Sequence, residues 1–224
     1  MSAIRGFIFD LDGVLVDTAK FHYLAWKRLA REAFGFELTE ELNEQFKGVN
    51  RIACMKLLCE WTGAKLSDED FTTMTDRKNG WYVEYVKRMT PKDVLPGALE
   101  FVKECRMAGL KLAIGSASKN CRLVLERTGL GPLFDAVSDG TVVTRAKPDP
   151  EVFLTAAAML KLSPWECVVF EDAQAGIDAA KTGGMKAVAI SSPTALTGFD
   201  AAFTGLNAID LQLLLMELNR SARP

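Results

Sequence analysis

The chain has 224 residues, of which 49% are hydrophobic, and its formal net charge is −2. This composition favours a packed core over a disordered chain, and the absence of a broad basic excess argues against a nucleic-acid binder. A single histidine, His22, and five widely spaced cysteines without a CxxC pair supply too few ligands for a zinc site.

The N-terminal half of the chain predicts one strand followed only by helices. The strand is the apolar run Gly6–Asp10, and no strand-like run follows before residue 90. The predicted helices cover Thr18–Phe34, Thr39–Phe46, Asn50–Trp61 and Ser67–Arg88. They lead into a segment, Thr90–Gly97, that contains two prolines and ends in glycine, which is typical of a linker.

From Pro96 onward, strands and helices alternate. The predicted strands are Lys111–Gly115, Ala136–Ser138, which is the weakest, Cys167–Glu171 and Lys186–Ile190; the helices are Ala98–Met107, Asn120–Thr128, Pro150–Leu160 and Gln174–Lys181. Alternation of this kind predicts a doubly wound, Rossmann-like α/β domain with a parallel sheet. We therefore expect an α/β core of residues 1–15 and 93–224, with residues 16–92 inserted as an α-helical cap domain.

Two aspartates end the first strand, in the sequence FIFDLDGVLVDT. Asp10 and Asp12 are two residues apart and should point to the same side, at the carboxyl edge where open α/β sheets bind ligands. Two carboxylates so close would repel each other unless a cation joins them, and an all-oxygen site suits Mg²⁺. Asp12 followed by Gly13 is also common in simple turns, which is the structural alternative.

Other polar segments should reach the same edge. The second core strand runs into SASKN, Ser116–Asn120, at a helix start whose free N–H groups favour a phosphate. Glu171 and Asp172 follow the strand Cys167–Glu171, and Lys147 precedes the helix that leads to it, although a lysine at such a position is often merely solvated. This collection of carboxylates, serines and lysines suits phosphoryl transfer.

Four motifs in this order, FDLDGVLVDT, GSASKN, KPDP and EDAQAG, resemble those of the haloacid dehalogenase superfamily. The cap segments HYLAW, KGVNR and RKN resemble more closely the members that interconvert β-D-glucose 1-phosphate and β-D-glucose 6-phosphate. The sequence departs from relatives at Ala173, where a serine is common, so any hydrogen bond from that serine is missing.

The resemblance implies roles for the core residues. Asp10 would be the nucleophile and Asp12 the general acid and base. Mg²⁺ would be held by Asp10, Asp172 and the backbone carbonyl of Asp12, with Glu171 close by. The transferring phosphoryl group would lie against Lys147, Ser116 and neighbouring backbone N–H groups such as that of Ala117.

The resemblance also implies a second phosphate site and cap residues near the substrate. Arg51, with Gly48, Val49, Ser118, Lys119 and Asn120, would bind the phosphate that is not transferred. Thr18, His22 and Trp26 share one helical stripe. His22 is expected to hold Asp12. Trp26 is suited equally to core packing and to substrate contact. Lys78 is a further substrate-binding candidate, on a helix where most lysines are solvated.

These features leave several functions open. The first is a mutase that works through a phosphoaspartyl enzyme and β-glucose 1,6-bisphosphate, and the second is a Mg²⁺-dependent sugar-phosphate phosphatase. A dehalogenase would not need Asp12, and a non-enzymatic binding module would be expected to lack a catalytic carboxylate, so both rank lower. Closure of the cap on its two linkers would exclude water from the phosphoenzyme.

The terminal sequences bear on location. The N-terminus lacks a signal-peptide pattern, and the apolar run LQLLLMEL is too short to span a bilayer. We expect a cytoplasmic monomer with reduced cysteines that acts on small phosphorylated sugars and binds neither nucleic acid nor membrane.

Overall fold

The computed structural model describes residues 4–46, 49, 51–190 and 196–220. It divides into two compact units, one formed by Met1–Asp17 with Thr90–Pro224 and the other by Thr18–Met89. We call these the α/β unit and the helical unit. The prediction from sequence gave 16–92 for the helical insertion.

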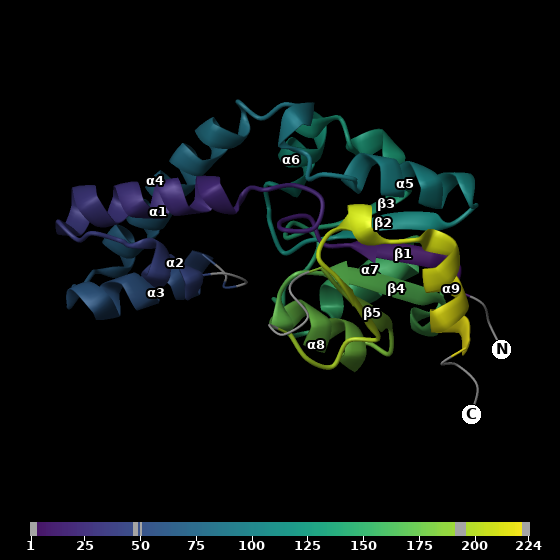
Figure 1. Ribbon diagram of the computed structural model, residues 1–224. Helices are drawn as coiled ribbons and strands as arrows, with labels where there is room; N and C mark the ends of the chain where they lie inside the picture. Colours follow the sequence, from purple (N-terminus) through teal and green to yellow (C-terminus); the bar gives the residue numbers. More distant parts are fainter. Residues whose placement is uncertain (1–3, 47–48, 50, 191–195, 221–224) are drawn as a thin grey trace. The chain divides into compact units, whose positions relative to one another are not determined.

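The α/β unit is built on a six-stranded sheet with the strand order β3-β2-β1-β4-β5-β6 (Figure 1). The strands are β1 (Gly6–Phe9), β2 (Lys111–Gly115), β3 (Ala136–Ser138), β4 (Cys167–Glu171), β5 (Lys186–Ile190) and β6 (Ala201–Phe203). Every pair is parallel, and the chain order reverses direction across the sheet beside β1. The predicted doubly wound α/β fold is therefore confirmed.

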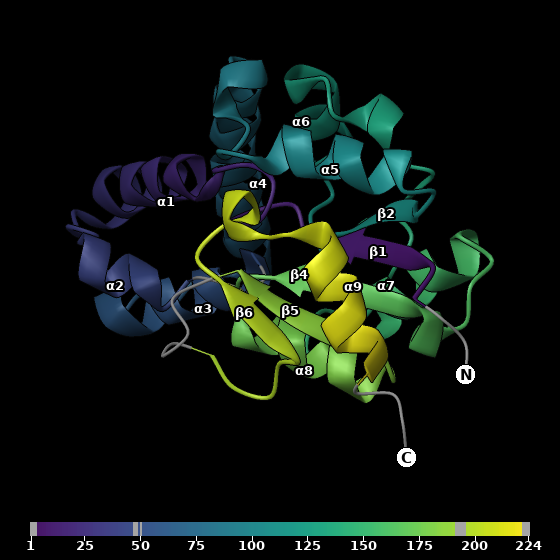
Figure 2. The same ribbon diagram turned by 45° about the vertical axis from the view of Figure 1, so that its right-hand side comes forward.

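Alternate residues of β1 bury opposite faces of the sheet. Ile8 packs into a cluster with Phe153, while the Phe7 ring stacks on Phe101 at 6.4 Å between centroids. The helices of this unit are α5 (Ala98–Met107), α6 (Cys121–Thr128), α7 (Glu151–Met159), α8 (Gln174–Thr182) and α9 (Leu211–Arg220). Helices α7 and α8 supply the Ile8 side, and α5 and α9 pack together on the other, where α9 lies in front of the sheet in Figure 2.

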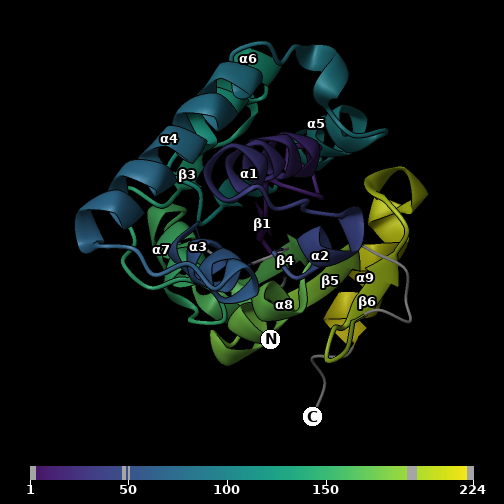
Figure 3. The ribbon, with the colours of Figure 1, turned by 90° about the vertical axis from the view of Figure 1, so that its left-hand side faces the viewer.

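The helical unit contains α1 (Ala19–Phe34), α2 (Glu40–Glu44), α3 (Arg51–Thr62) and α4 (Asp68–Val86). Figure 3 views α1 nearly along its axis, with α4 passing beside it. The helices begin and end at standard signals: the Ser67 hydroxyl accepts a hydrogen bond from Asp70 N at 3.1 Å, and Gly35 ends α1 in the left-handed conformation at φ 60°. Trp26 and Met55 lie in the core between these helices.

The two connections to the helical unit lie beside each other within the α/β unit. Val16 pairs with Val94 in an antiparallel bridge, and Leu95 N donates to Leu15 O at 2.9 Å. The predicted linker thus contains ordered structure, including the short 3-10 helix Pro91–Asp93. The other 3-10 helices are Gly131–Leu133, Pro164–Glu166 and Leu206–Ala208.

The predicted strands and helices are found with ends shifted by a few residues, and α2 is shorter than Thr39–Phe46. Two elements near the C-terminus, β6 and α9, were not predicted. In the part of the chain that the structure describes, no helix combines the length and the apolar character needed to cross a bilayer.

Candidate active site

The register of the sheet brings the predicted catalytic residues to one edge. Phe9 pairs with Ile114 on one side and with Phe170 on the other, so β1, β2 and β4 end at the same level. Asp10 N continues the ladder by donating to Phe170 O at 2.9 Å. The side chains that follow these strands therefore meet at the carboxyl edge, where α/β sheets place their ligands.

Lys147 joins the first and fourth strands at this edge. Its ammonium contacts the Asp10 carboxylate and donates to Glu171 Oε2 at 2.8 Å, and only 10% of its side chain is exposed. Burial alone would lower the pKa of Lys147, but the charges of Asp10 and Glu171 outweigh it and raise the pKa above its usual range. Lys147 is thus held as a buried cation, and Phe153 lies with its ring 4.7 Å from the ammonium.

The Asp172 carboxylate lies against Gly13, the residue that follows Asp12. Gly13 has φ +80°, and a Cβ atom there would lie 2.0 Å from Asp172 Oδ2, so only glycine leaves room for this carboxylate. Burial, then the neighbouring charges of Asp10 and Asp172, raises the pKa of Asp12 to about 8. Asp12 can therefore hold a proton at neutral pH, which a general acid requires.

The acidic residues form a cluster suited to a hard cation. Carboxylate oxygens of Asp10, Glu171 and Asp172 lie within 4.8 Å of one another. Burial and the Asp10 charge raise the pKa of Glu171, a sign of carboxylates crowded without enough positive charge. Among the described residues, the buried Asp12 Oδ1 has no hydrogen-bond partner. An all-oxygen set with surplus negative charge fits a divalent ion such as Mg²⁺.

The SASKN loop lies between β2 and α6. Ser116 is buried and its Oγ accepts from Ser118 N at 3.2 Å, while Ser118 Oγ accepts from Asn120 N at 3.2 Å. Ala117 and Lys119 are exposed. The loop therefore turns its residues alternately inward and outward at the edge that also holds Asp10.

The helical unit brings three of its predicted residues together. Lys78 Nζ lies 2.9 Å from His22 Nδ1 and 4.7 Å from the Trp26 ring centroid. An ammonium has only donors, so Nδ1 accepts and the ring proton of the neutral imidazole is on Nε2. Removal from water, and then the charges of Lys78 and Arg51, hold the pKa of His22 well below its usual range.

One of these residues differs from the prediction, and another follows one of its two predicted alternatives. Lys78, expected on a solvated helix, is only 2% exposed, and Trp26 belongs to the core of the helical unit, as the packing alternative predicted. Tyr82, which the sequence analysis did not single out, is fully buried and stacks on His22 with 4.0 Å between ring centroids. Its i, i+4 spacing from Lys78 was a usable signal for this cluster.

The remaining helical-unit candidates are more scattered. Arg51 begins α3 and pairs with Asp76 at 3.5 Å, while Thr18 is buried next to the start of α1 and its hydroxyl finds no partner among the described residues. Val49 is exposed, and Gly48 lies outside the described residues. The structure thus leaves the predicted second phosphate site a proposal.

The glycine of EDAQAG, Gly176, has a structural role that the sequence analysis did not predict. A Cβ atom at Gly176, in the first turn of α8, would lie 2.1 Å from the Glu171 carboxyl carbon. The Glu171 side chain folds back against that turn, and its Oε1 accepts from Ala173 N at 3.3 Å. The glycine in EDAQAG is therefore required by close approach and not by flexibility.

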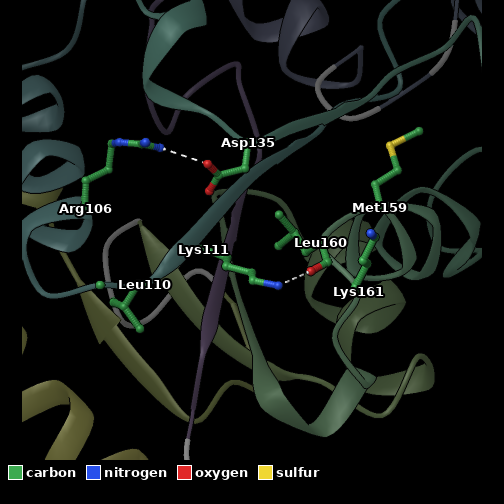
Figure 4. Close-up of a pocket in the computed structure, with 8 residues that line it drawn as sticks. Arg106, Leu110, Lys111, Asp135, Met159, Leu160 and Lys161 are labelled. Atoms are coloured by element: carbon green, nitrogen blue, oxygen red, sulfur yellow. Dashed lines mark hydrogen bonds and ion pairs between the residues drawn. The ribbon is translucent and has the colours of Figure 1, made fainter.

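An open concavity of about 390 Å³ lies elsewhere in the α/β unit. It is lined by residues that include Arg106, Lys111 and Asp135, at the amino ends of β2 and β3. Figure 4 shows Arg106 directed at Asp135, 3.2 Å away, and Lys111 at the Leu160 carbonyl, 2.7 Å away. These polar groups satisfy one another, and the concavity is at the wrong end of the strands for the catalytic chemistry.

Comparison with known proteins agrees with this geometry. The chain is 36% identical to the β-phosphoglucomutase of Bacillus subtilis strain 168 over 213 residues, which cover 94% of both chains. It is 35% identical to a phosphorylated carbohydrates phosphatase of Thermotoga maritima over 185 residues, covering 81% of this chain and 82% of the relative.

A solved structure is similarly close. The crystal structure of a β-phosphoglucomutase from Clostridium difficile matches 97% of this chain and 98% of its own, with 33% identity and a TM-score of 0.91. Residues 4–184 match the family model of the haloacid dehalogenase-like hydrolases. The predicted resemblance and the prediction of an enzyme are confirmed, and the chain belongs to the haloacid dehalogenase-like hydrolase family.

Proposed function

We propose that this enzyme is a Mg²⁺-dependent sugar-phosphate mutase that interconverts β-D-glucose 1-phosphate and β-D-glucose 6-phosphate. The proposal is carried by the contact of Asp10 with buried Lys147, beside an acid, Asp12, that can keep its proton at neutral pH. The similarity to β-phosphoglucomutases over 94% or more of each chain favours the mutase among the reactions that this edge supports.

The first half-reaction uses Asp10 as nucleophile. A carboxylate oxygen of Asp10 attacks the phosphorus of β-glucose 1,6-bisphosphate, and the bond from phosphorus to the sugar oxygen breaks. The departing oxygen takes the proton of Asp12. Lys147, already held at Asp10, neutralises the phosphoryl oxygens, and the Ser116 hydroxyl donates to them.

The second half-reaction reverses these roles on the other sugar hydroxyl. Asp12, now a carboxylate, takes the proton of that hydroxyl. At the same time the hydroxyl oxygen attacks the phosphorus of the phosphoaspartate. The bond from phosphorus to Asp10 breaks, which restores the Asp10 carboxylate and the proton on Asp12. Each turn thus exchanges a monophosphate for its isomer by way of the bisphosphate.

Mg²⁺ would be held by Asp10, Asp172 and the backbone carbonyl of Asp12, with Glu171 beside them. When bound, it neutralises charge on the transferring phosphoryl group. Glu171 also helps to hold Lys147, with 2.8 Å between Glu171 Oε2 and the ammonium. The same carboxylate therefore orients the cation that faces the phosphoryl group.

The phosphate that is not transferred is assigned to Arg51, Ser118, Lys119 and Asn120, with Gly48 and Val49 supplying backbone groups. An arginine suits this role because its guanidinium binds two phosphate oxygens at once. His22 is assigned to Asp12, which it would hold by a hydrogen bond, and Lys78 is assigned to the substrate. The proposed substrate is therefore a small phosphorylated sugar. The monomeric state and the cytoplasmic location stay predictions.

A second candidate is a sugar-phosphate phosphatase, in which water attacks the phosphoaspartate in place of a sugar hydroxyl. The 35% identity to the Thermotoga maritima phosphatase supports this candidate. In addition, the roles proposed for Asp10, Asp12 and Lys147 are the same in both reactions.

One assay separates the two. Purified enzyme with Mg²⁺, β-glucose 1-phosphate and a trace of the 1,6-bisphosphate is followed for glucose 6-phosphate and for inorganic phosphate in the same tube. Formation of glucose 6-phosphate without phosphate release supports the mutase, and phosphate as main product overturns it. Arg51→Ala should cripple the mutase while leaving hydrolysis of a monophosphate largely intact.

A further inference from the structure

The turn that follows β3 lies directly against the SASKN loop. Ser116 N donates to Ser138 O at 3.0 Å, which extends the pairing of β2 with β3 by one hydrogen bond. Gly140 N donates to Ser118 O at 3.3 Å. The turn after β3 therefore holds the loop at two points.

Gly140 approaches the backbone of the loop too closely for any side chain. A Cβ atom at Gly140 would lie 2.3 Å from Ala117 O and 3.0 Å from Lys119 N. Gly140 is absent from the described residues with positive φ, so close approach and not backbone conformation demands glycine. Because the atoms it would meet belong to backbone, the loop would have to move to admit a methyl group.

Asp139 fixes this turn in place. Its carboxylate is fully buried. Oδ1 accepts a hydrogen bond from Thr141 N at 2.9 Å, whereas Oδ2 has no hydrogen-bond partner among the described residues and forms an ion pair with Arg122 Nε at 3.0 Å. Arg122 lies in the first turn of α6, the helix that begins where the SASKN loop ends. The turn is thus tied to the far end of the same loop that it supports.

The supported loop leaves alternate amides available. Ser118 N and Asn120 N donate to the hydroxyls of Ser116 and Ser118, at 3.2 Å each. By contrast, among the described residues neither Ala117 N nor Lys119 N has a hydrogen-bond acceptor within the protein, and both residues are exposed. Backbone N–H groups without an acceptor, just before the start of a helix, favour an anion.

We propose that Asp139 and Gly140 are positioning residues, which hold the SASKN loop so that the Ala117 and Lys119 amides stay directed at phosphate. The proposal rests on the proposed function, since it takes this loop as a phosphate-binding element. Neither residue touches the substrate. They act through the backbone of the loop.

The test is a titration of ¹⁵N-labelled protein with inorganic phosphate in the presence of Mg²⁺, following the Ala117 and Lys119 amide signals. Gly140→Ala should weaken the apparent phosphate affinity by about tenfold or more, because a displacement of about 1 Å is costly at such a site. The matched control is Gly131→Ala, where a Cβ atom meets nothing nearer than 3.9 Å. That change should alter the affinity by less than about twofold.

The outcomes separate the two levels of the proposal. If the wild-type amides do not respond to phosphate, the loop is not a phosphate site and the proposed function is at fault. If they respond equally in wild type and in Gly140→Ala, the positioning role is overturned and the function stands. A purely structural role would lower the thermal midpoint of Gly140→Ala without changing its phosphate affinity.

A milder variant covers the case in which Gly140→Ala does not fold. Asp139→Asn keeps an acceptor for Thr141 N but loses the charge that pairs with Arg122. We expect it to fold and to weaken phosphate binding by about threefold, in the range of a partly exposed ion pair. Unaltered affinity in Asp139→Asn would also overturn the positioning role.

Discussion

The α/β unit and the helical unit each bury a lysine, and they surround it differently. Lys147 contacts the carboxylates of Asp10 and Glu171, and 10% of its side chain is exposed. Lys78, 2% exposed, lies 4.7 Å from the Trp26 ring centroid, 5.3 Å from that of Tyr82 and 2.9 Å from His22 Nδ1.

The difference shows how each unit uses its cation. In the α/β unit the positive charge is matched by carboxylates, which raises the pKa of Lys147 and supports chemistry on an anionic phosphoryl group. In the helical unit the ammonium faces π-systems and an imidazole, and burial, followed by the charge of Lys78, lowers the pKa of His22. On the proposed function, residues of the first unit make and break the bonds to phosphorus, and residues of the second contact the sugar.

The largest effect that tests this assignment is expected from Asp10→Asn. The amide is no nucleophile, so phosphoryl transfer should fall by at least about 10⁴-fold, while Glu171 still pairs with Lys147 and preserves the fold. This prediction is checked by measuring turnover and by detecting the phosphoenzyme after an acid quench. If Asp10→Asn still transferred phosphate and still formed a labelled phosphoenzyme, the nucleophile would be a residue other than Asp10.

Asp12→Asn should have the next largest effect. It keeps the nucleophile but removes the proton that the leaving oxygen takes, so both half-reactions should slow by about 10²- to 10⁴-fold. Rapid-quench measurement of the phosphoenzyme formed from the bisphosphate isolates the first of them. A burst as fast as that of the wild type would assign the proton to another group.

Replacing each buried lysine by methionine sharpens the comparison directly. Lys147→Met leaves Asp10 and Glu171 buried without their cation, which should lower the free energy of unfolding by about 3–5 kcal/mol. Mg²⁺ should restore part of this loss, because it returns positive charge to the cluster. Lys78→Met should cost less and show no Mg²⁺ dependence, since a thioether packs well against aromatic rings.

Urea unfolding with and without Mg²⁺ measures these differences. Lys111→Met is a control in the α/β unit, because the one acceptor of its ammonium among the described residues is the Leu160 carbonyl. It should cost about 1 kcal/mol whether or not Mg²⁺ is present. Equal stability of Lys147→Met and Lys111→Met without Mg²⁺ would contradict the buried ion cluster.

The smallest predicted effect is the pH dependence due to His22. In the unfolded chain His22 takes up a proton near its ordinary pKa of 6.5, whereas in the folded protein its pKa is well below that value. The unfolded state therefore binds more protons below about pH 6.5, and this histidine costs stability as the pH falls through that region. Above it the cost disappears.

His22→Gln should flatten this part of the stability curve. Because His22 is the only histidine in the chain, one imidazole NMR signal reports its pKa in the intact protein. Lys78→Met should raise that pKa toward the ordinary value. A normal pKa in the wild type, or one indifferent to Lys78→Met, would argue against the ammonium–imidazole contact.

Much of the fold follows from simple sequence patterns. The apolar runs of β1, β2, β4 and β5 are continuous because both faces of a parallel sheet are covered. Because the carboxyl ends of parallel strands share an edge, the sequence alone predicts that Asp10, Lys147 and Glu171 lie together. The strand β6 was missed because three residues, Ala201–Phe203, carry no periodicity.

The parts that were missed depend on contacts between distant segments. Nothing local marks Gly140 as touching Ala117, because that approach exists only after β3 pairs with β2. The burial of Lys78 was hidden by the charged residues around it in the sequence of α4. The apolar positions of α9 were weighed only as a membrane segment, although Leu211, Leu214 and Leu218 follow helical spacing and are buried.

The antiparallel contact of Leu15 and Val16 with Val94 and Leu95 has an evolutionary consequence. The segment by which the chain leaves the α/β unit and the segment by which it returns are therefore hydrogen-bonded to each other. The entropy of closing an inserted segment grows slowly, by about 0.6 kcal/mol for each doubling of its length. Inserted segments of very different length are therefore compatible with the same sheet and the same register, so this point of the chain can accept a change of insert.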